Sequence, residues 1–162
     1  MAEMRKPTKY IVLIATHAMA LGVGVGLGIY LLPILIAPEG PAVEAVQSVA
    51  DDAQFSGVFH RDLADSDALH WGEGTLFVGA DSIALEGRLA PGPDYRLYLS
   101  PEFVETEAAF AEIKPQMVEV GLINTFDNFM ISVPDSINPA DYKAAIVWCE
   151  SFGQFITATT YQ

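Results

Sequence analysis

The sequence predicts a mainly β fold: an antiparallel β-sandwich or barrel-like domain of about eight strands with one short helix, preceded by a single transmembrane helix. Two observations support this. Residues 10–36 form an uncharged apolar run, and eight short segments between residues 54 and 161 have the composition of strands, with turn residues between them. We expect four regions along the chain: a cytoplasmic tail (1–9), a transmembrane helix (10–36), a linker (37–52) and the β-sandwich domain (53–162).

The first element is the apolar run from Tyr10 to Ile36, which contains no Asp, Glu, Lys or Arg. As a helix it is about 40 Å long at ~1.5 Å per residue, whereas a bilayer core of roughly 30 Å needs only ~20 residues. A cleaved signal peptide is the alternative, but its apolar region is usually about 7–15 residues long. In addition, Leu35-Ile36-Ala37 lacks the small-x-small pattern of a cleavage site. We therefore expect an uncleaved anchor.

Basic residues precede the anchor, at Arg5, Lys6 and Lys9, and acidic residues follow it. Positive charge tends to remain on the cytoplasmic side of a membrane, so we expect the N-terminus inside and the C-terminal domain outside. In a bacterium this is a single-pass protein of the inner membrane with a periplasmic domain. The periplasm is oxidising, so a free cysteine there must be shielded or used.

The formal net charge of −13 belongs to the second part of the chain, because residues 50–162 hold 5 basic and 18 acidic side chains. This excess excludes binding of nucleic acid, or of an anionic lipid surface, through the domain's own field. An acidic surface would instead steer a basic protein partner toward the domain. The alternative explanation is an adaptation for solubility.

Four glycines alternate with larger residues in the membrane helix, at Gly22, Gly24, Gly26 and Gly28. Spacing by four places them in two small-xxx-small ridges, and small residues let helix backbones approach closely in lipid. The ridges point to self-association or to a membrane-protein partner. Glycine is also common in unpartnered membrane helices, so both interpretations stay open.

After the linker, with Pro38, Gly40 and Pro41, the expected strands follow in order. They are Gln54–His60, Gly74–Val78, Ser82–Arg88, Tyr95–Ser100, Val118–Ile123, Asn128–Val133, Ala144–Cys149 and Gln154–Tyr161. Clusters of Pro, Gly and Asp at 90–94 and 134–136 are turn signals. The strand that ends at Cys149 is apolar on both faces, as a central strand would be. Its alternation places Ile146 and Trp148 on one face and Ala145, Val147 and Cys149 on the other.

The one expected helix begins after Ser100, which can act as the N-cap, with Pro101 at the first helical position. Phe103, Phe110 and Ile113 form its apolar stripe, and it should end near Lys114, before a proline.

Cys149 is the only cysteine, so it cannot form an internal disulfide. It is a buried filler, a partner in an intermolecular bond or a redox group. The neighbouring Glu150 would raise its pKa, whereas a reactive thiol needs a lowered one. Oxidation to sulfenic acid or a mixed disulfide is the chemistry open to it.

No cofactor can be assigned from the sequence. The absence of a Cys-x-x-Cys-His motif excludes covalent haem. Three ligand types are dispersed in the β domain, at His60, His70 and Cys149, with Met117 or Met130, and such dispersed residues are a weak signal for a metal or haem site. No Gly-x-Ser-x-Gly elbow and no phosphate-binding loop between a strand and a helix are present, so no conventional enzyme is indicated.

Several motifs, in order, resemble the DM-thirteen domain, also called the electron-transfer DM domain. They are Phe55–Phe59, His70, Gly74, Gly92–Ser100, Val120–Ile123, Val133-Pro134 and Tyr142–Ala158. The most distinctive is Ile146–Phe152, and the resemblance covers about residues 53–161. It implies a β-sandwich and a role in redox chemistry or electron transfer with the cysteine, here Cys149, as the redox-active group.

Two hypotheses therefore stand. In the first, the protein is a membrane-anchored redox or electron-transfer accessory whose working group is Cys149, with Trp148, Phe152 and Tyr142 shaping its surroundings. In the second, it is a non-catalytic interaction module that docks a partner protein or membrane complex through its acidic face or its glycine ridges.

Overall fold

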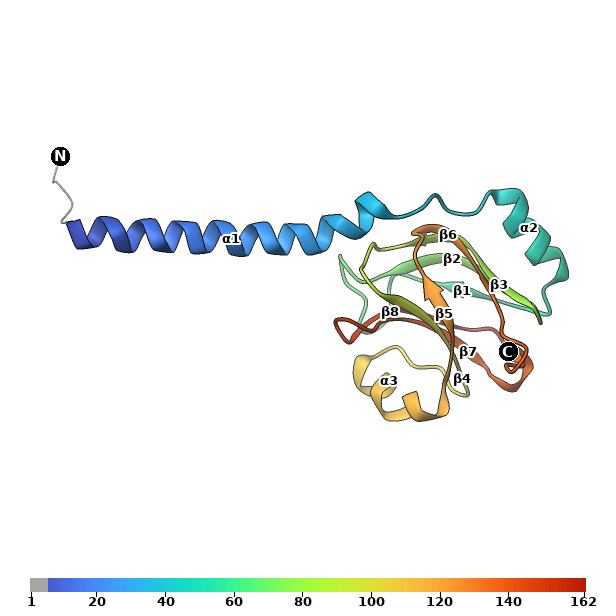
Figure 1. Ribbon diagram of the computed structural model, residues 1–162. Coiled ribbons are helices and arrows are strands. Elements are labelled where there is room, and N and C mark those ends of the chain that lie inside the picture. Colours follow the sequence, from blue (N-terminus) through green and yellow to red (C-terminus); the bar gives the residue numbers. More distant parts are fainter. Residues whose placement is uncertain (1–5) are drawn as a thin grey trace.

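The computed structural model describes residues 6–162 and consists of a long N-terminal helix followed by a β domain (Figure 1). Residues 1–5, which include Arg5 of the expected cytoplasmic tail, lie outside the described residues. Helix α1 (Lys6–Ile36) contains a segment, Pro7–Ile36, that is long and apolar enough to cross a membrane. Its side chains in this segment are not buried by the rest of the chain. In Figure 1 most of α1 extends away from the domain.

Eight antiparallel strands form two four-stranded sheets, as the sequence predicts. The first sheet has the order β1-β2-β3-β6 and the second β5-β4-β7-β8. The strands are β1 (Phe55–Phe59), β2 (Gly72–Val78), β3 (Ser82–Leu89), β4 (Tyr95–Ser100), β5 (Val118–Ile123), β6 (Asp127–Ser132), β7 (Ala144–Cys149) and β8 (Gln154–Thr160). Each observed strand lies within two residues of its predicted bounds, because clean alternation and strong turn residues mark both ends.

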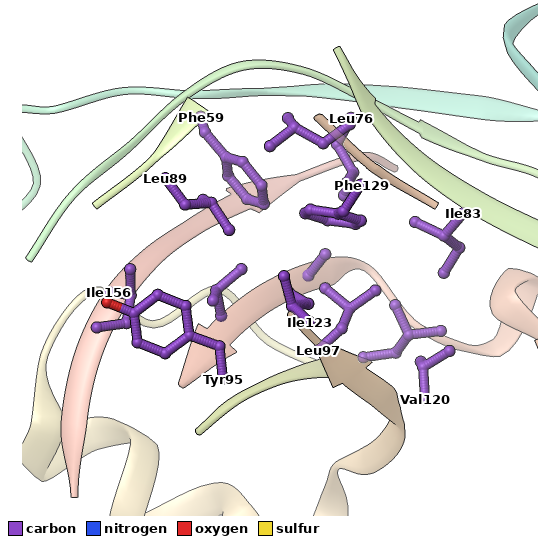
Figure 2. Packing of buried hydrophobic residues seen from close by; sticks show 14 of the residues in the cluster. Phe59, Leu76, Ile83, Leu89, Tyr95, Leu97, Val120, Ile123, Phe129 and Ile156 are labelled. Atoms are coloured by element: carbon purple, nitrogen blue, oxygen red, sulfur yellow. The ribbon is translucent and has the colours of Figure 1, made fainter. Parts of the chain in front are cut away.

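The main core lies between the two sheets (Figure 2). Large apolar side chains from the inner faces of both sheets fill it. The first sheet contributes Phe59, Leu76, Ile83, Leu89 and Phe129, and the second contributes Tyr95, Leu97, Val120, Ile123 and Ile156. This face-to-face arrangement is the defining feature of a β-sandwich and confirms the predicted fold class.

Strand β7 is buried on both faces, because a helix covers the side that does not face the core. Ala145, Val147 and Cys149 belong to the core between the sheets. Ile146 and Trp148 belong to a second apolar cluster on the outer face of the same sheet. The alternation predicted from the sequence is therefore confirmed.

The segment expected to be a linker, 37–52, contains helix α2 (Val43–Asp52). The helix lies against the first sheet, where Val46 is fully buried and the Gln47 amide donates a 2.8 Å hydrogen bond to Glu86. Val46 and Val49 are three residues apart, the spacing of one helix face, and this side turns toward the sheet, whereas Val43 at the start of the helix is 50% exposed.

The helix expected to begin after Ser100 begins later, so that prediction was wrong. Ser100 is the last residue of β4 and is paired with Ala144, and its hydroxyl caps a short turn by accepting from the N–H of Glu102 at 3.2 Å. Helix α3 (Glu107–Ile113) has Thr106 as its N-cap, whose hydroxyl accepts from Ala109 at 3.2 Å. Short 3₁₀ turns follow at Lys114–Gln116 and Pro139–Asp141.

Phe110 is the anchor of α3 on the second sheet. It is fully buried and stacks on the Trp148 ring, with 3.9 Å between ring centroids and an interplanar angle of 10°. Tyr98 meets the Phe110 ring edge-on, with 5.4 Å between ring centroids. Phe103, expected on the buried stripe, is 40% exposed because it lies before the helix begins. Helix α3 therefore covers Trp148, and the chain forms four layers: α2, two sheets and α3 (Figure 1).

Candidate functional site

Cys149 is the last residue of β7, at the end of the sandwich nearest to α1. It is a free thiol, 2% exposed, in the core between the sheets. Strand pairing places it opposite Tyr95 of β4 on one side and Gln154 of β8 on the other. Strand β7 is hydrogen-bonded to a neighbouring strand on each side, which holds the backbone of Cys149 in place.

Two opposing effects act on the pKa of the Cys149 thiol. Burial raises it, because a thiolate loses hydration in an apolar surrounding. Backbone groups of Phe152, Asp94 and Ser151 near the thiol lower its pKa, and the nearby carboxylate of Asp94 raises it again. Burial prevails, so the pKa lies above its ordinary value and the thiol is protonated at neutral pH. These backbone groups still provide a ready environment for an anion or a polar oxidised sulfur.

An apolar cavity of about 140 Å³ lies directly beside Cys149, and we call it the cysteine cavity. Its lining comes from three parts of the chain: the domain's strand ends, the loops at this end of the sandwich, and α1. The lining residues used below are Leu69, His70, Pro91, Gly92, Pro93, Tyr95, Phe152, Gly26 and Tyr30. The volume is close to that of an engineered cavity of roughly 150 Å³ that admits benzene. A single ring or a small oxidant fits it.

The turn at residues 91–94 positions Tyr95 and the β7–β8 hairpin. A Cβ atom on Gly92 would lie 2.4 Å from the Tyr95 ring, so only glycine lets this loop pass so close to the tyrosine. Asp94 accepts hydrogen bonds from Arg96 at 3.1 Å and from the Ser151 hydroxyl at 3.0 Å, and its carbonyl accepts from Glu150 at 3.0 Å. These bonds fix the two chain segments whose backbone groups lie near the sulfur.

Of the three residues expected to surround Cys149, the structure brings only Phe152 to the cysteine cavity. Its ring is 55% exposed at the cavity mouth. Trp148 points to the opposite face of β7, under α3. Tyr142 precedes β7 at the strand's other end, where it packs partly buried against the core. Successive side chains of a strand point to opposite faces of the sheet, so Trp148 and Cys149 lie on opposite faces of β7.

The outer face of the second sheet holds a charged network of its own. Lys114 donates to Glu150 at 2.6 and 2.9 Å, and the Tyr98 hydroxyl also donates to Glu150. Partial burial raises the pKa of Glu150, but the hydrogen bonds from Lys114 and Tyr98 outweigh it and hold the pKa below its ordinary value. Glu150 is therefore ionised and already paired, and it stands apart from the cysteine cavity.

Among the residues that the structure describes, no three His, Cys, Asp or Glu side chains come close enough to hold a metal ion. Of the dispersed ligands considered from sequence, His70 lines the cysteine cavity, and its Nδ1 lies 3.0 Å from the Asp67 carboxylate. Met130 is on the surface of β6, 49% exposed. The structure thus does not gather these residues around one point.

Leu69 and Tyr30 were not expected near Cys149, and Tyr95 and His70 were expected only as parts of the family motifs, but all four residues line the cysteine cavity. The motif Gly92–Ser100 was the available signal for Tyr95. The signal for Leu69 and Tyr30 is absent from the sequence, because they approach Cys149 only through the packing of distant segments.

A comparison with known proteins bears on this site. A protein-family model described as Electron transfer DM13 matches residues 62–161. The match begins just after β1, ends just after β8, and includes Cys149 and the loops of the cysteine cavity. No curated protein and no solved structure gives a significant match to the chain.

Proposed function

The chain belongs to the Electron transfer DM13 family, and we propose that it is a membrane-anchored redox or electron-transfer accessory whose redox-active group is Cys149. The observation that supports this most is the placement of the thiol. It is the chain's only sulfhydryl, it lines an apolar cavity, and backbone groups of three residues lie near it.

The chemistry open to a single thiol is oxidation at sulfur. A hydroperoxide that enters the cavity transfers one oxygen to the thiol, which gives a sulfenic acid and releases an alcohol or water. A partner thiol then forms a mixed disulfide with Cys149 and releases water. A second partner thiol displaces Cys149 as a thiol. In sum, two electrons pass from a dithiol partner to the peroxide. The backbone groups at 94, 151 and 152 stabilise the polar sulfenic acid.

We place this domain outside the cytoplasm, held by α1 as a single-pass anchor with its N-terminus inside. Support comes from the length and apolarity of Pro7–Ile36 and from the basic residues that precede it. For a bacterial protein the compartment is the periplasm, where oxidants and thiol partners both occur.

The experiment uses full-length protein purified in detergent and treated with a small hydroperoxide. Thiol loss is followed together with capture of sulfenic acid by a dimedone-type probe, located by mass spectrometry. We expect a probe adduct on Cys149 in the folded protein and its loss when thiol reductant is added first. Cys149→Ser should abolish the adduct, while Ser132→Ala, an exposed residue at the end of β6 in the other sheet, should keep it. A thiol that stays reduced until the domain unfolds would refute the proposal.

An alternative function is a non-catalytic interaction module that docks a membrane partner. The observation that favours it is the open glycine ridge: a Cβ on Gly22, Gly24, Gly26 or Gly28 would meet nothing within 4 Å. If a partner helix packs on these glycines, the protein and its partner can be isolated together in mild detergent. Gly24→Leu should then dissociate this complex, whereas Val25→Leu, on a different face of the helix, should leave it intact. A chain that runs as a monomer before and after substitution contradicts this alternative.

A further inference from the structure

One end of the sandwich exposes apolar side chains beside the outer part of α1. Leu69 is 53% exposed, Phe152 is 55% exposed, and Leu122 is 48% exposed. The first two line the cysteine cavity together with Gly26 and Tyr30 of α1. Leu122 lines a neighbouring groove with Pro33 and Ile36. We call Leu69, the loop 91–93, Leu122 and Phe152 the apolar tip.

We propose that the apolar tip docks into the outer leaflet of the membrane beside α1, so that the cysteine cavity opens toward lipid. This inference depends on α1 being the membrane anchor, as proposed above. It adds a contact between the domain itself and the bilayer, which the anchor alone does not require.

The length of α1 supports this contact. Its 31 residues make a helix of about 46 Å at ~1.5 Å per residue, which exceeds a hydrocarbon core of roughly 30 Å. Counted from Tyr10, about 20 residues cross the core, so its outer boundary falls near Tyr30. Tyrosine is typical of that boundary. Leu69 and Phe152 share a cavity with Tyr30, and they therefore lie at the depth where hydrocarbon begins.

The residues beside the last turn of α1 suit the headgroup layer. A groove there is lined by Ile34, Pro38, Arg61, Trp71 and Arg88, among others. The Arg61 guanidinium lies 3.3 Å from the centroid of the Trp71 ring. Tryptophan and arginine are the residues that occupy the interface between hydrocarbon and water. Apolar side chains at the level of Tyr30 and an Arg–Trp pair at the level of Ile34 match the polarity gradient of a leaflet.

The domain's negative charge does not oppose this contact, because the acidic groups nearest to the tip are paired. Asp94 lies 3.1 Å from Arg96, and Glu150 lies 2.6 Å from Lys114. The Asp67 carboxylate accepts from the backbone N–H groups of Leu69 and His70 at 2.7 and 2.8 Å. A zwitterionic lipid surface meets little unpaired negative charge at this end.

The occupant is membrane lipid because α1, the anchor, lies beside the tip: Gly26 and Tyr30 line the same cavity as Leu69 and Phe152. The anchor holds the tip at the leaflet permanently, so docking needs no separate encounter. Each apolar side chain that enters the leaflet contributes in proportion to its buried area. A further consequence concerns the proposed redox site: an oxidant that reaches Cys149 through the cavity mouth arrives from the lipid.

The test uses full-length protein in vesicles of phosphatidylethanolamine and phosphatidylcholine, which are both zwitterionic. In a Cys149→Ser background, a nitroxide is attached to one new cysteine at a time, at Leu69→Cys or Phe152→Cys. Val58→Cys and Met130→Cys are matched controls, because these residues are 46% and 49% exposed and lie away from the tip. Collision of each nitroxide with oxygen, which concentrates in lipid, is compared with collision with a water-soluble nickel chelate.

We expect nitroxides at 69 and 152 to favour oxygen and those at 58 and 130 to favour the nickel chelate. If positions 69 and 152 behave like 58 and 130, the docking proposal is wrong. Leu21→Cys, in the middle of α1, separates this failure from failure of the anchor. A lipid signal at 21 with a water signal at 152 overturns docking alone, whereas a water signal at 21 overturns the anchor as well.

Discussion

Phe110→Ala tests whether Cys149 is reached in the folded domain, on which the redox proposal depends. Phe110 is fully buried and stacked on Trp148, so its removal should lower the free energy of unfolding by about 3–5 kcal/mol. It lies on the face of β7 opposite to the sulfur. If a small maleimide reached Cys149 only through global unfolding, this variant would accelerate labelling by about two to three and a half orders of magnitude. Our account expects almost no acceleration.

Phe152→Ala is the companion variant, because this ring closes the cavity mouth. A fully buried apolar side chain contributes ~1.5–3 kcal/mol, and Phe152 is about half covered, so its packing is worth about 1 kcal/mol. Loss of that packing should raise the labelling rate about fivefold. Labelling is followed in native buffer, and stability by denaturant unfolding of the same samples. An acceleration by Phe110→Ala far above that of Phe152→Ala would refute local access.

Three further predictions concern the surroundings of the site. The free energy of unfolding should fall above about pH 10. Burial raises the pKa of Tyr95 above its ordinary value of 10.0, so above that pH the unfolded chain loses the tyrosine proton while the folded chain keeps it, and the stability that burial of the neutral ring contributes is lost as pH rises toward the folded pKa. Unfolding midpoints between pH 8 and 11 measure this. Lys114→Met should raise the pKa of Glu150, and a carboxyl titration by NMR would show no change if the ion pair were absent in solution. Gly92→Ala should destabilise the domain by about 1–3 kcal/mol, because the new methyl meets the Tyr95 ring, and a melting temperature equal to that of the parent would contradict this contact.

The strands were predictable because their signals are local. In β7, alternation alone assigned Ile146 and Trp148 to one face and Cys149 to the other, and the structure agrees. The start of α3 was not predictable in the same way. Ser100 and Thr106 are both good N-caps, and the choice between them is made by the pairing of Ser100 with Ala144, a contact distant in sequence.

The surroundings of Cys149 show the same limit. Phe152 lines the cysteine cavity because it follows in the same hairpin. Trp148, expected to shape the surroundings of Cys149, lies on the opposite face of β7, where the alternation in the sequence places it. Leu69 and Tyr30 lie beside Cys149 through packing between segments far apart in the chain, which composition and spacing do not encode.

The central claim is that Cys149 undergoes reversible oxidation while the domain is folded and anchored. The most direct measurement is the oxidation state of this sulfur in intact cells that make the full-length protein. After a brief exposure to hydroperoxide, sulfenic acid is captured in the living cells and the Cys149 peptide is analysed by mass spectrometry. We predict a captured fraction that rises with peroxide and returns to thiol when the oxidant is removed. A Cys149 peptide that stays fully reduced, while exposed thiols of other proteins in the same envelope are oxidised, would contradict the account.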